Sequence, residues 1–318
     1  MEPTVPDIGR QYQILQPLAQ GKFGNVFLAK IKRTDETIII KQGIPPAPKI
    51  PNQPPNPNKT NSGGTAALET IRHEAEILTF LNQEPACRKY IPFVHWYGLC
   101  SKGIYCIAMN YIPTAPLNSS DPPTLIESTL QQMLREITQA LKAIHQKGII
   151  HRDMKPENIL YHQSKKRWQL IDFGLATFYQ DEDGNHKSPT TPPRKNIIGT
   201  PNFVSCFIHE GQEPSRRDDL IALGHVAWWL RNGGSWVFPP PPTSQQSSTI
   251  LPMTWEQTLE AKKALSTQSP TLEKNPENLF RIKLAMFIKN GYTLGYTDTP
   301  QYDTISKFFS ETPSQKTK

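Results

Sequence analysis

The segment that decides the fold reads His151-Arg152-Asp153-Met154-Lys155-Pro156-Glu157-Asn158 and then, after a short hydrophobic link, Asp172-Phe173-Gly174. Phosphoryl transfer from ATP needs a carboxylate beside the attacking hydroxyl, a cation on the γ-phosphate and ligands for Mg²⁺. Asp153 and Lys155 are the candidates for the first two roles. Asn158 and Asp172 are the candidate metal ligands. A plain Asp- and Asn-rich turn between strands would explain neither this order nor the partners found upstream, so the spacing predicts a catalytic loop followed by a metal-binding loop.

Length and charge bound the class of protein. The chain has 318 residues and a formal net charge of +7 at pH 7, and this length suits about two lobes that each bury a core. The positive excess fits an enzyme that handles nucleotide phosphates or acidic protein substrates, and it fits plain solubility equally well. The sequence lacks the interleaved aromatic and basic residues typical of nucleic-acid binding, so no nucleic-acid partner is indicated.

Cysteine usage and targeting patterns predict a soluble intracellular protein, in the cytoplasm, the nucleus or both, with no membrane partner. The cysteines form no Cys-x-x-Cys pair and show no metal-ligand spacing, which favours a reducing compartment. The N-terminus shows no signal peptide, Glu2 excludes a myristoylation start, and the longest apolar run, 220–230, is too short to span a bilayer. The cysteines are Cys87, Cys100, Cys106 and Cys206.

Two short strands are predicted over residues 12–19 and 25–31, because apolar and polar side chains alternate there. The turn between them contains Gly21 and Gly24, and glycines let backbone amides approach phosphate oxygens with no side chain in the way. Ala19 stands where such a phosphate-binding loop usually carries another glycine. A lone Gly-x-x-Gly more often marks an ordinary hairpin, so the surrounding segments must support the phosphate role.

A third strand, 36–41, ends in Lys41, and the next helix, 68–81, contains Glu74. Glu74 falls within the buried apolar stripe of that helix, where a carboxylate needs a cationic partner. Lys41 is the expected partner, in an ion pair that holds the lysine on the α- and β-phosphates. The alternatives are a surface lysine that closes the strand and a glutamate that reaches solvent. The stripe consists of Leu68, Ile71, Ala75 and Leu78.

The segment 43–64 is polar and proline-rich, and we expect an insertion that buries no core. Five of its prolines recur every third residue, which is the period of a polyproline II helix. One hypothesis is a docking strip for an aromatic-lined groove such as that of an SH3 domain. The plainer alternative is a semi-rigid surface insertion. The five prolines are Pro45, Pro48, Pro51, Pro54 and Pro57.

Strands over 93–98 and 103–109 complete a five-stranded sheet, and Pro113 marks a natural boundary. After this boundary the pattern becomes mainly helical. We expect an N-lobe over residues 1–112, a C-lobe over 113–310 and a polar tail over 311–318.

Residues around this boundary are candidates for binding an adenine ring. Main-chain groups of Asn110 and Ile112 are placed to bind the adenine edge, and Met109 is placed at the rear of the pocket. Two side chains of the sheet would cover the ring on one face and Leu160 would cover the other. The residues expected to contact adenine are Val26, Ile39, Met109, Asn110, Ile112 and Leu160.

The C-lobe helices include one apolar helix with clear start signals. Ser215 is a suitable N-cap, and acidic residues occupy the first turn. Asp219 in that turn precedes Leu223-Gly224 with the spacing that protein kinases use to hold the backbone of the catalytic loop, and this resemblance implies the same role here. The helices are predicted over 126–144, 215–230, 255–265, 277–289 and 302–309.

The polar loop after Asp172 contains two candidate proline-directed phosphorylation sites, Ser188-Pro189 and Thr191-Pro192. Arg152, next to the catalytic aspartate, would pair with such a phosphate. An unmodified flexible loop is an equally good interpretation.

The run Ser215-Arg216-Arg217-Asp218-Asp219-Leu220 resembles the casein kinase 1 superfamily, which includes the vaccinia-related and tau-tubulin kinases. Residues 204–208 replace the usual Ala-Pro-Glu, as in that family, and residues 294–309 look like its closing segment. The resemblance covers roughly residues 10–310. It implies an α+β, bilobal protein-kinase fold. The small lobe would hold a five-stranded antiparallel sheet plus one helix, and the larger lobe would be mainly α-helical.

The resemblance also implies a Ser/Thr kinase that uses ATP and Mg²⁺ on protein substrates, and Lys155 and Thr200 agree with that specificity. Thr177 and Asn202 stand where the family often has Lys and Arg, so we expect no strong preference for pre-phosphorylated substrates. Ile39 replaces a small alanine and should narrow the adenine site.

Two other functions are weighed against this one. A pseudokinase scaffold has support only from Ala19 and Ile39, whereas every charged group of the mechanism is present. A proline-rich adaptor would act through the strip described above. Phosphotransferase activity is therefore the preferred prediction.

Overall fold

The computed structural model describes residues 11–21, 24–43, 62–100, 103–114, 117, 125–234, 236, 255–267 and 279–310. The chain forms two compact units. The N-terminal unit comprises Met1–Pro113 together with Asp172–Gly174, and the C-terminal unit comprises Thr114–Ile171 and Leu175–Lys318. The proline strip between Pro45 and Pro57 lies outside the described residues, so its docking role stays a prediction.

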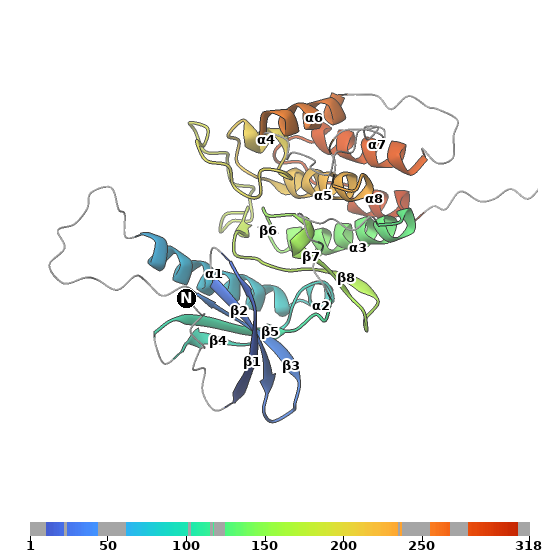
Figure 1. Cartoon of the computed structure of the whole chain (residues 1–318). Helices are drawn as coiled ribbons and strands as arrows, with labels where there is room; N and C mark the ends of the chain where they lie inside the picture. Colours follow the sequence, from blue (N-terminus) through green and yellow to red (C-terminus); the bar gives the residue numbers. More distant parts are fainter. Residues whose placement is uncertain are drawn as a thin grey trace, which may run out of the picture. The chain divides into compact units, whose positions relative to one another are not determined.

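The N-terminal unit contains the five-stranded antiparallel sheet expected from the sequence, in the order β1-β2-β3-β5-β4 (Figure 1). Alternation decides the faces of its strands: Ile38 and Ile40 of β3 are fully buried, whereas Ile39 between them is only half-buried. The strands are β1 (Tyr12–Gln20), β2 (Gly24–Ile31), β3 (Thr37–Gly43), β4 (Val94–Leu99) and β5 (Tyr105–Asn110).

Helix α1 (Ser62–Asn82) packs against β3, β4 and β5 of this sheet, and the short helix α2 (Pro85–Arg88) follows it. The predicted stripe is buried in its described part, because Ile71, Ala75 and Leu78 have no exposed surface. The helix starts six residues before the expected start at Leu68. Two glycines and a threonine at its beginning gave no apolar period from which to place the start.

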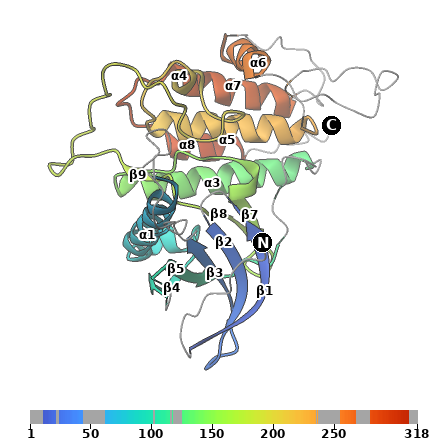
Figure 2. The same ribbon diagram turned by 60° about the vertical axis from the view of Figure 1, so that its left-hand side comes forward.

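The C-terminal unit is mainly helical, as expected. Figures 1 and 2 show α5 between α3 and α7, and it packs against both. Gly224 of α5 and Gly291 of α7 let these two helices approach, since a Cβ on either would lie within 2.7 Å of an isoleucine on the other. The helices are α3 (Glu127–Gln146), α4 (Cys206–His209), α5 (Arg216–Arg231), α6 (Trp255–Thr267), α7 (Leu279–Thr293) and α8 (Tyr302–Phe308).

Short strands and one 3₁₀ turn shape the loops of this unit. The 3₁₀ turn η1 (Pro156–Asn158) leads into the hairpin of β7 (Ile159–His162) and β8 (Arg167–Leu170), which the sequence did not predict. Strand β6 (Ile149–Ile150), which precedes this hairpin in the chain, pairs with β9 (Thr177–Phe178), which follows it. Among the described helices, none is long and apolar enough to cross a bilayer.

Ser215 begins α5 as predicted, through a capping box with Asp218. The carboxylate of Asp218 accepts from the Ser215 N–H at 2.8 Å and from the Ser215 hydroxyl at 3.2 Å. The same carboxylate accepts a short hydrogen bond from the hydroxyl of Ser205. The start of α5 is thereby tied to the chain just before α4.

Candidate active site

Lys41 of β3 lies at the centre of a charged cluster in the N-terminal unit. Its Nζ lies 2.6 Å from Oε2 of Glu74 on α1 and 2.8 Å from Oδ1 of Asp172. The other carboxylate oxygen of Glu74 accepts the N–H of Phe173 at 3.3 Å. The ion pair predicted between strand and helix is therefore present, and Asp172 joins it.

Burial opposes the charges of this cluster, since the side chain of Glu74 is 1 % exposed and that of Lys41 is 15 % exposed. Burial raises the pKa of Glu74 and would lower the pKa of Lys41. At Lys41 the attraction of Glu74 and Asp172 outweighs burial and raises its pKa. We take the cluster as charged, because both carboxylates lie within hydrogen-bond distance of the one amine.

Asp172 has a backbone conformation that residues other than glycine rarely adopt. Its φ of 62° lies in the left-handed region, where non-glycine residues are uncommon and aspartate is among the better tolerated. Gly174 follows closely, and a Cβ there would lie 3.0 Å from the methyl group of Thr70 on α1. Such strain in a carboxylate-bearing turn is typical of a functional site.

The predicted phosphate-binding loop forms a turn closed by a hydrogen bond from the Gly21 N–H to the Gly24 carbonyl at 2.8 Å. Gly24 leaves no room for a Cβ against the carbonyl of Gln42 on β3. Ala19 on β1 pairs with Val26 on β2, directly after the turn. Residues 22–23 lie outside the described part of the chain. The role of this turn toward phosphate stays a prediction.

The residues predicted to contact adenine belong to both units. Val26 pairs with Lys41, and Ile39 pairs with Met109, whose side chain is buried. Asn110 ends β5, and its N–H donates to the carbonyl of Phe93 at 3.0 Å. The last two residues predicted to contact adenine, Ile112 and Leu160, are both buried. Ile112 follows β5 in the N-terminal unit, and Leu160 lies on β7 in the C-terminal unit.

Asp153 lies at the centre of the second cluster, in the C-terminal unit. Its Oδ1 accepts from the Thr200 hydroxyl at 2.7 Å. Its Oδ2 accepts from Lys155 Nζ at 2.7 Å and from the Asn158 side-chain amide at 3.2 Å. That amide also donates to the Asp153 carbonyl at 2.9 Å. Both oxygens of a carboxylate on a side chain only 8 % exposed are thus held in place.

Asp219 holds the backbone of the catalytic loop, as its spacing predicted. Its carboxylate accepts the N–H groups of His151 at 2.8 Å and Arg152 at 2.9 Å. Nε2 of His145 lies 2.9 Å from the same carboxylate, and Nδ1 of His145 lies 2.6 Å from the hydroxyl of Tyr302. Burial alone would raise the pKa of Asp219, but these hydrogen bonds reverse the effect and lower it.

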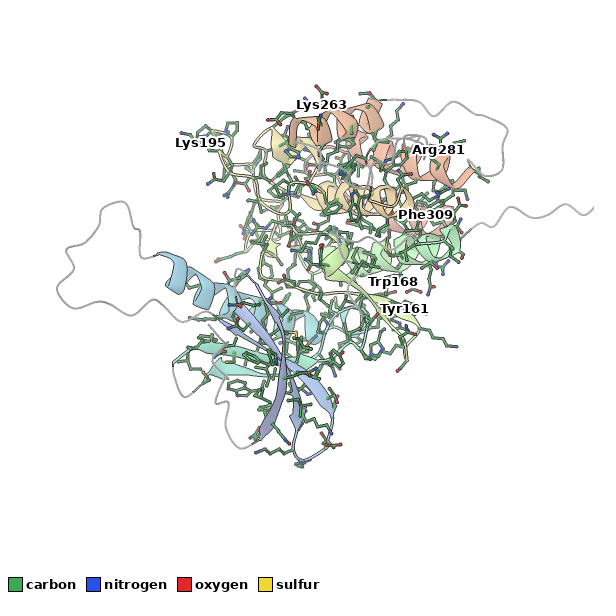
Figure 3. All side chains as sticks on the ribbon, viewed as in Figure 1. Tyr161, Trp168, Lys195, Lys263, Arg281 and Phe309 are labelled. Carbon is green, nitrogen blue, oxygen red and sulfur yellow. The ribbon has the colours of Figure 1, made fainter. Side chains whose placement is uncertain are left out.

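The loop proposed as a phosphorylation switch presents the hydroxyls of both candidate sites to solvent. Ser188 and Thr191 are exposed, as is Lys195 nearby (Figure 3). The neighbouring Thr190 donates to the carboxylate of Glu213, which also pairs with Arg194. The Nε of Arg152 donates to the carbonyl of Leu175 at 2.6 Å. A role for phosphorylation therefore stays a prediction.

Three supporting residues had no signal in the sequence. His145 and Tyr302 stabilise Asp219 from helices far apart along the chain. Lys262 of α6 is fully buried and donates to two backbone carbonyls near Thr200. A periodic pattern places helices, but it does not say which distant polar groups they meet.

The two predicted metal ligands carry the type of donor atom that suits Mg²⁺, and each belongs to a different unit. Asn158 and Asp172 offer hard oxygen ligands, which Mg²⁺ prefers. Within the described residues, no three His, Cys, Asp or Glu side chains gather as a metal cage. Mg²⁺ suits such a sparse set, because it commonly completes its shell with water and substrate phosphates.

The sequence matches a known family over most of its length. A model of the protein kinase domain matches residues 12–290. This range includes both clusters, the glycine turn and helices α1 to α6. The five-stranded sheet with its helix and the mainly helical second unit are the architecture of that domain. The chain therefore belongs to the protein kinase family.

Proposed function

We propose that this protein kinase transfers the γ-phosphoryl group of Mg-ATP to serine and threonine hydroxyls of protein substrates. The observation that carries the proposal is the Asp153 carboxylate, which three donors hold on both of its oxygens. A carboxylate fixed in this way is suited to orient a hydroxyl and to accept its proton late in the reaction.

The remaining charged groups have roles set by their chemistry. Bound Mg-ATP supplies the transferable phosphoryl group and a cation that neutralises charge on the phosphates. Lys41, held by Glu74, would bind the α- and β-phosphates, while Asn158 and Asp172 would hold Mg²⁺. Lys155, 2.7 Å from Asp153, would neutralise the charge that develops on the transferred group.

Specificity for serine and threonine rests on the surroundings of Asp153. Lys155 occupies the position that differs in tyrosine kinases, and Thr200 donates to the catalytic carboxylate. Phosphoamino-acid analysis of a labelled acceptor protein tests this directly. Phosphotyrosine as the main product would contradict the proposed specificity.

We place the kinase in the casein kinase 1 superfamily, near its vaccinia-related branch, because of the run from Ser215 to Leu220. Asp218 of that run bonds Ser215 and Ser205, in the stretch that lacks Ala-Pro-Glu. Arg217 donates to the Leu294 carbonyl at 2.9 Å and lies over the ring of Phe207, with 3.6 Å to its centroid. These contacts give the distinctive residues structural roles.

An intracellular setting and the proline strip complete the proposal. All four cysteines are buried thiols and none forms a disulfide, which supports a reducing compartment.

Recovery of SH3-type domains with and without residues 44–60 tests the docking strip. Equal recovery would leave these prolines as a surface insertion.

The test of activity compares the wild type with Asp153→Asn in a radiometric assay on casein or histone. We expect the variant to lose about three orders of magnitude in kcat while its affinity for ATP stays within about twofold, because the carboxylate acts mainly in the transition state. Asp303→Asn is the matched control, since Asp303 is an exposed aspartate paired with Lys142.

The same assay separates the competing functions. A wild type that binds ATP but labels no acceptor would support a pseudokinase scaffold. A wild type that neither binds ATP nor labels an acceptor, yet captures partners through the proline strip, would support an adaptor. Full activity of Asp153→Asn would exclude the proposed mechanism.

A further inference from the structure

Lys262 of α6 is a fully buried side chain in the C-terminal unit. Its Nζ donates to the carbonyl oxygens of Pro201 at 2.7 Å and Val204 at 2.9 Å. It also lies 3.2 Å from Nε2 of His209 and 5.4 Å from the ring centroid of Trp236. The two carbonyls accept from the amine, and the tautomer of His209 decides whether its Nε2 accepts as well.

None of these acceptors is a carboxylate, and no Asp or Glu among the described residues forms an ion pair with Lys262. Burying an unpaired ammonium is costly, and here burial lowers the pKa of Lys262 to about 7. A methionine would fill a similar volume without that cost. The presence of a lysine is therefore best explained by the groups that its N–H donors hold.

The other ionisable side chains that face Lys262 come from α4, α5 and α7 and are neutral near pH 7. Burial lowers the pKa of His209 to about 4 and takes that of His225 well below its usual value. Burial raises the pKa of the Cys206 thiol and of the Tyr292 hydroxyl. Two charged residues, Glu210 and Lys263, lie close to this cluster, and both are exposed.

The two carbonyls that Lys262 holds belong to the turn that begins at Thr200. The carbonyl of Thr200 accepts the N–H groups of Phe203 at 2.9 Å and Val204 at 3.2 Å, which closes the turn. Lys262 bridges the Pro201 and Val204 carbonyls of this same turn. The amine therefore fixes the turn that carries the Thr200 hydroxyl.

On its other side, Thr200 is fixed against the catalytic loop. Gly199 adopts a φ of 96° and leaves no room for a Cβ against the carbonyl of Arg152. The Thr200 hydroxyl then reaches Oδ1 of Asp153 at 2.7 Å. A continuous path of contacts runs from the Lys262 amine to the Asp153 carboxylate.

We propose that Lys262 is a positioning residue for phosphoryl transfer, because it fixes the turn at Pro201–Val204 and thereby the hydroxyl that orients Asp153. This inference rests on the proposed function of Asp153. Lys262 itself is buried and would act through the turn and the Thr200 hydroxyl.

A double-mutant cycle with Thr200→Ala tests the proposal. We expect Lys262→Met to lower kcat about tenfold while the KM for ATP stays within about twofold, since orientation of the carboxylate matters in the transition state. In the Thr200→Ala background the same substitution should change kcat less than about twofold, because the path is already broken. Lys263→Met, one residue along α6 and exposed, is the control with unchanged kinetics (Figure 3).

A second measurement does not depend on activity. Hydrogen exchange of the peptide that contains Phe203 and Val204 should quicken at least about tenfold in Lys262→Met and stay unchanged in Lys263→Met. Lys262→Gln, which keeps two N–H donors, should show an intermediate rate and serves if the methionine variant does not fold. Both variants are compared with the wild type by thermal unfolding.

The outcomes separate this inference from the proposed function. Quickened exchange in a protein without kinase activity would uphold the role of Lys262 in the turn and remove the proposed function. Unchanged exchange, or unchanged kcat in an active enzyme, would overturn the inference. A loss of kcat that is equally large in the Thr200→Ala background would also overturn it, because Lys262 would then act by another route.

Discussion

Lys41 and Lys262 place the same side chain in two different surroundings, one in each unit. Lys41 has Glu74 and Asp172 within 2.8 Å of its amine, and together they raise its pKa. Lys262 has two backbone carbonyls as acceptors and a neutral histidine beside it, and burial lowers its pKa to about 7. Both amines are largely withdrawn from solvent, so the opposite directions of their pKa shifts come from the presence or absence of carboxylate partners.

The difference separates two uses of a lysine in a kinase domain. A lysine paired with carboxylates keeps its charge at every physiological pH and is suited to hold phosphates. A lysine that donates only to uncharged acceptors serves as a clamp on backbone. Substitutions of these lysines and of their neighbours test whether the two surroundings differ in their effects on stability, pH dependence and catalysis.

Among the substitutions that compare the two lysines, the largest effect is expected for Lys41→Met. We expect kcat/KM to fall at least about 100-fold, and stability to fall by about 3 kcal/mol at pH 8, because Glu74 is left buried without its cation. Without Lys41, burial raises the pKa of Glu74 above its usual 4.5, and so the loss of stability should grow as pH rises from 4.5. Urea unfolding at several pH values measures both quantities.

Lys30→Met is the matched control for this substitution. Lys30 also lies on a strand and pairs with an aspartate at 2.7 Å, but Asp35 is exposed. Removal of such a surface pair should cost less than about 1 kcal/mol at any pH. Equal losses in the two variants would mean that the buried cluster has no special weight.

The next effect concerns the pH dependence of Lys262→Met. The folded wild type loses a proton at Lys262 near pH 7, whereas the unfolded chain keeps it to about 10.5. The wild type should therefore gain stability relative to the variant as pH rises from 7 to 10.5, by at most about 1.4 kcal/mol per pH unit. Urea unfolding of both proteins at pH 7.5 and 9.5 gives the difference.

A difference between wild type and Lys262→Met that is independent of pH would contradict this expectation. It would mean that the buried amine keeps its proton in the folded protein, as Lys41 does. Lys263→Met should show no such change, because Lys263 is exposed.

A smaller effect is expected for Glu74→Gln, which removes one of the two carboxylates at Lys41. The amide can still accept the Phe173 N–H, and Asp172 still lies 2.8 Å from the lysine. We expect a loss of about 1–2 kcal/mol in stability and about tenfold in kcat/KM. A loss as large as that of Lys41→Met would show that Asp172 alone does not hold the amine.

Glu76→Gln is the control on the same helix. Glu76 is exposed and pairs with Arg72 one turn away, at 2.8 Å. Solvent screens such a pair, so Glu76→Gln should lower stability much less than Glu74→Gln. The comparison isolates the effect of burial on a glutamate of α1.

The same contrast explains what could be predicted from the sequence. The Lys41 cluster was predictable, because Glu74 interrupts an apolar stripe and a buried carboxylate demands a cation. Asp219 was predictable from its resemblance to the spacing found in kinases. The first prediction depends on local periodicity together with one strong physical requirement, and the second depends on family resemblance.

The surroundings of Lys262 were not predictable in this way. Polarity along α6 would favour burial of Leu259 and Leu265, yet among residues 256–267 the most buried are Thr258 and Lys262. The reason lies about 60 residues away in sequence, where the Pro201 and Val204 carbonyls supply acceptors. Hydrogen-bond partners of this kind are fixed by tertiary structure and leave no periodic signal.

The smallest effect is expected for Ile39→Ala, which changes shape beside Lys41 but no charge. Ile39 and Lys41 are alternate residues of β3, so their side chains share one face of the sheet. If charge dominates at this face, the affinity for ATP should rise or stay within about threefold. The narrowed site should instead show in binding of ATP analogues with bulky groups on adenine, which the variant should accept better than the wild type.

Leu15→Ala, an exposed leucine on β1, is the control. An identical affinity profile for wild type and Ile39→Ala would mean that Ile39 does not line the nucleotide site, and the proposed adenine contacts of β3 would need to be reassigned.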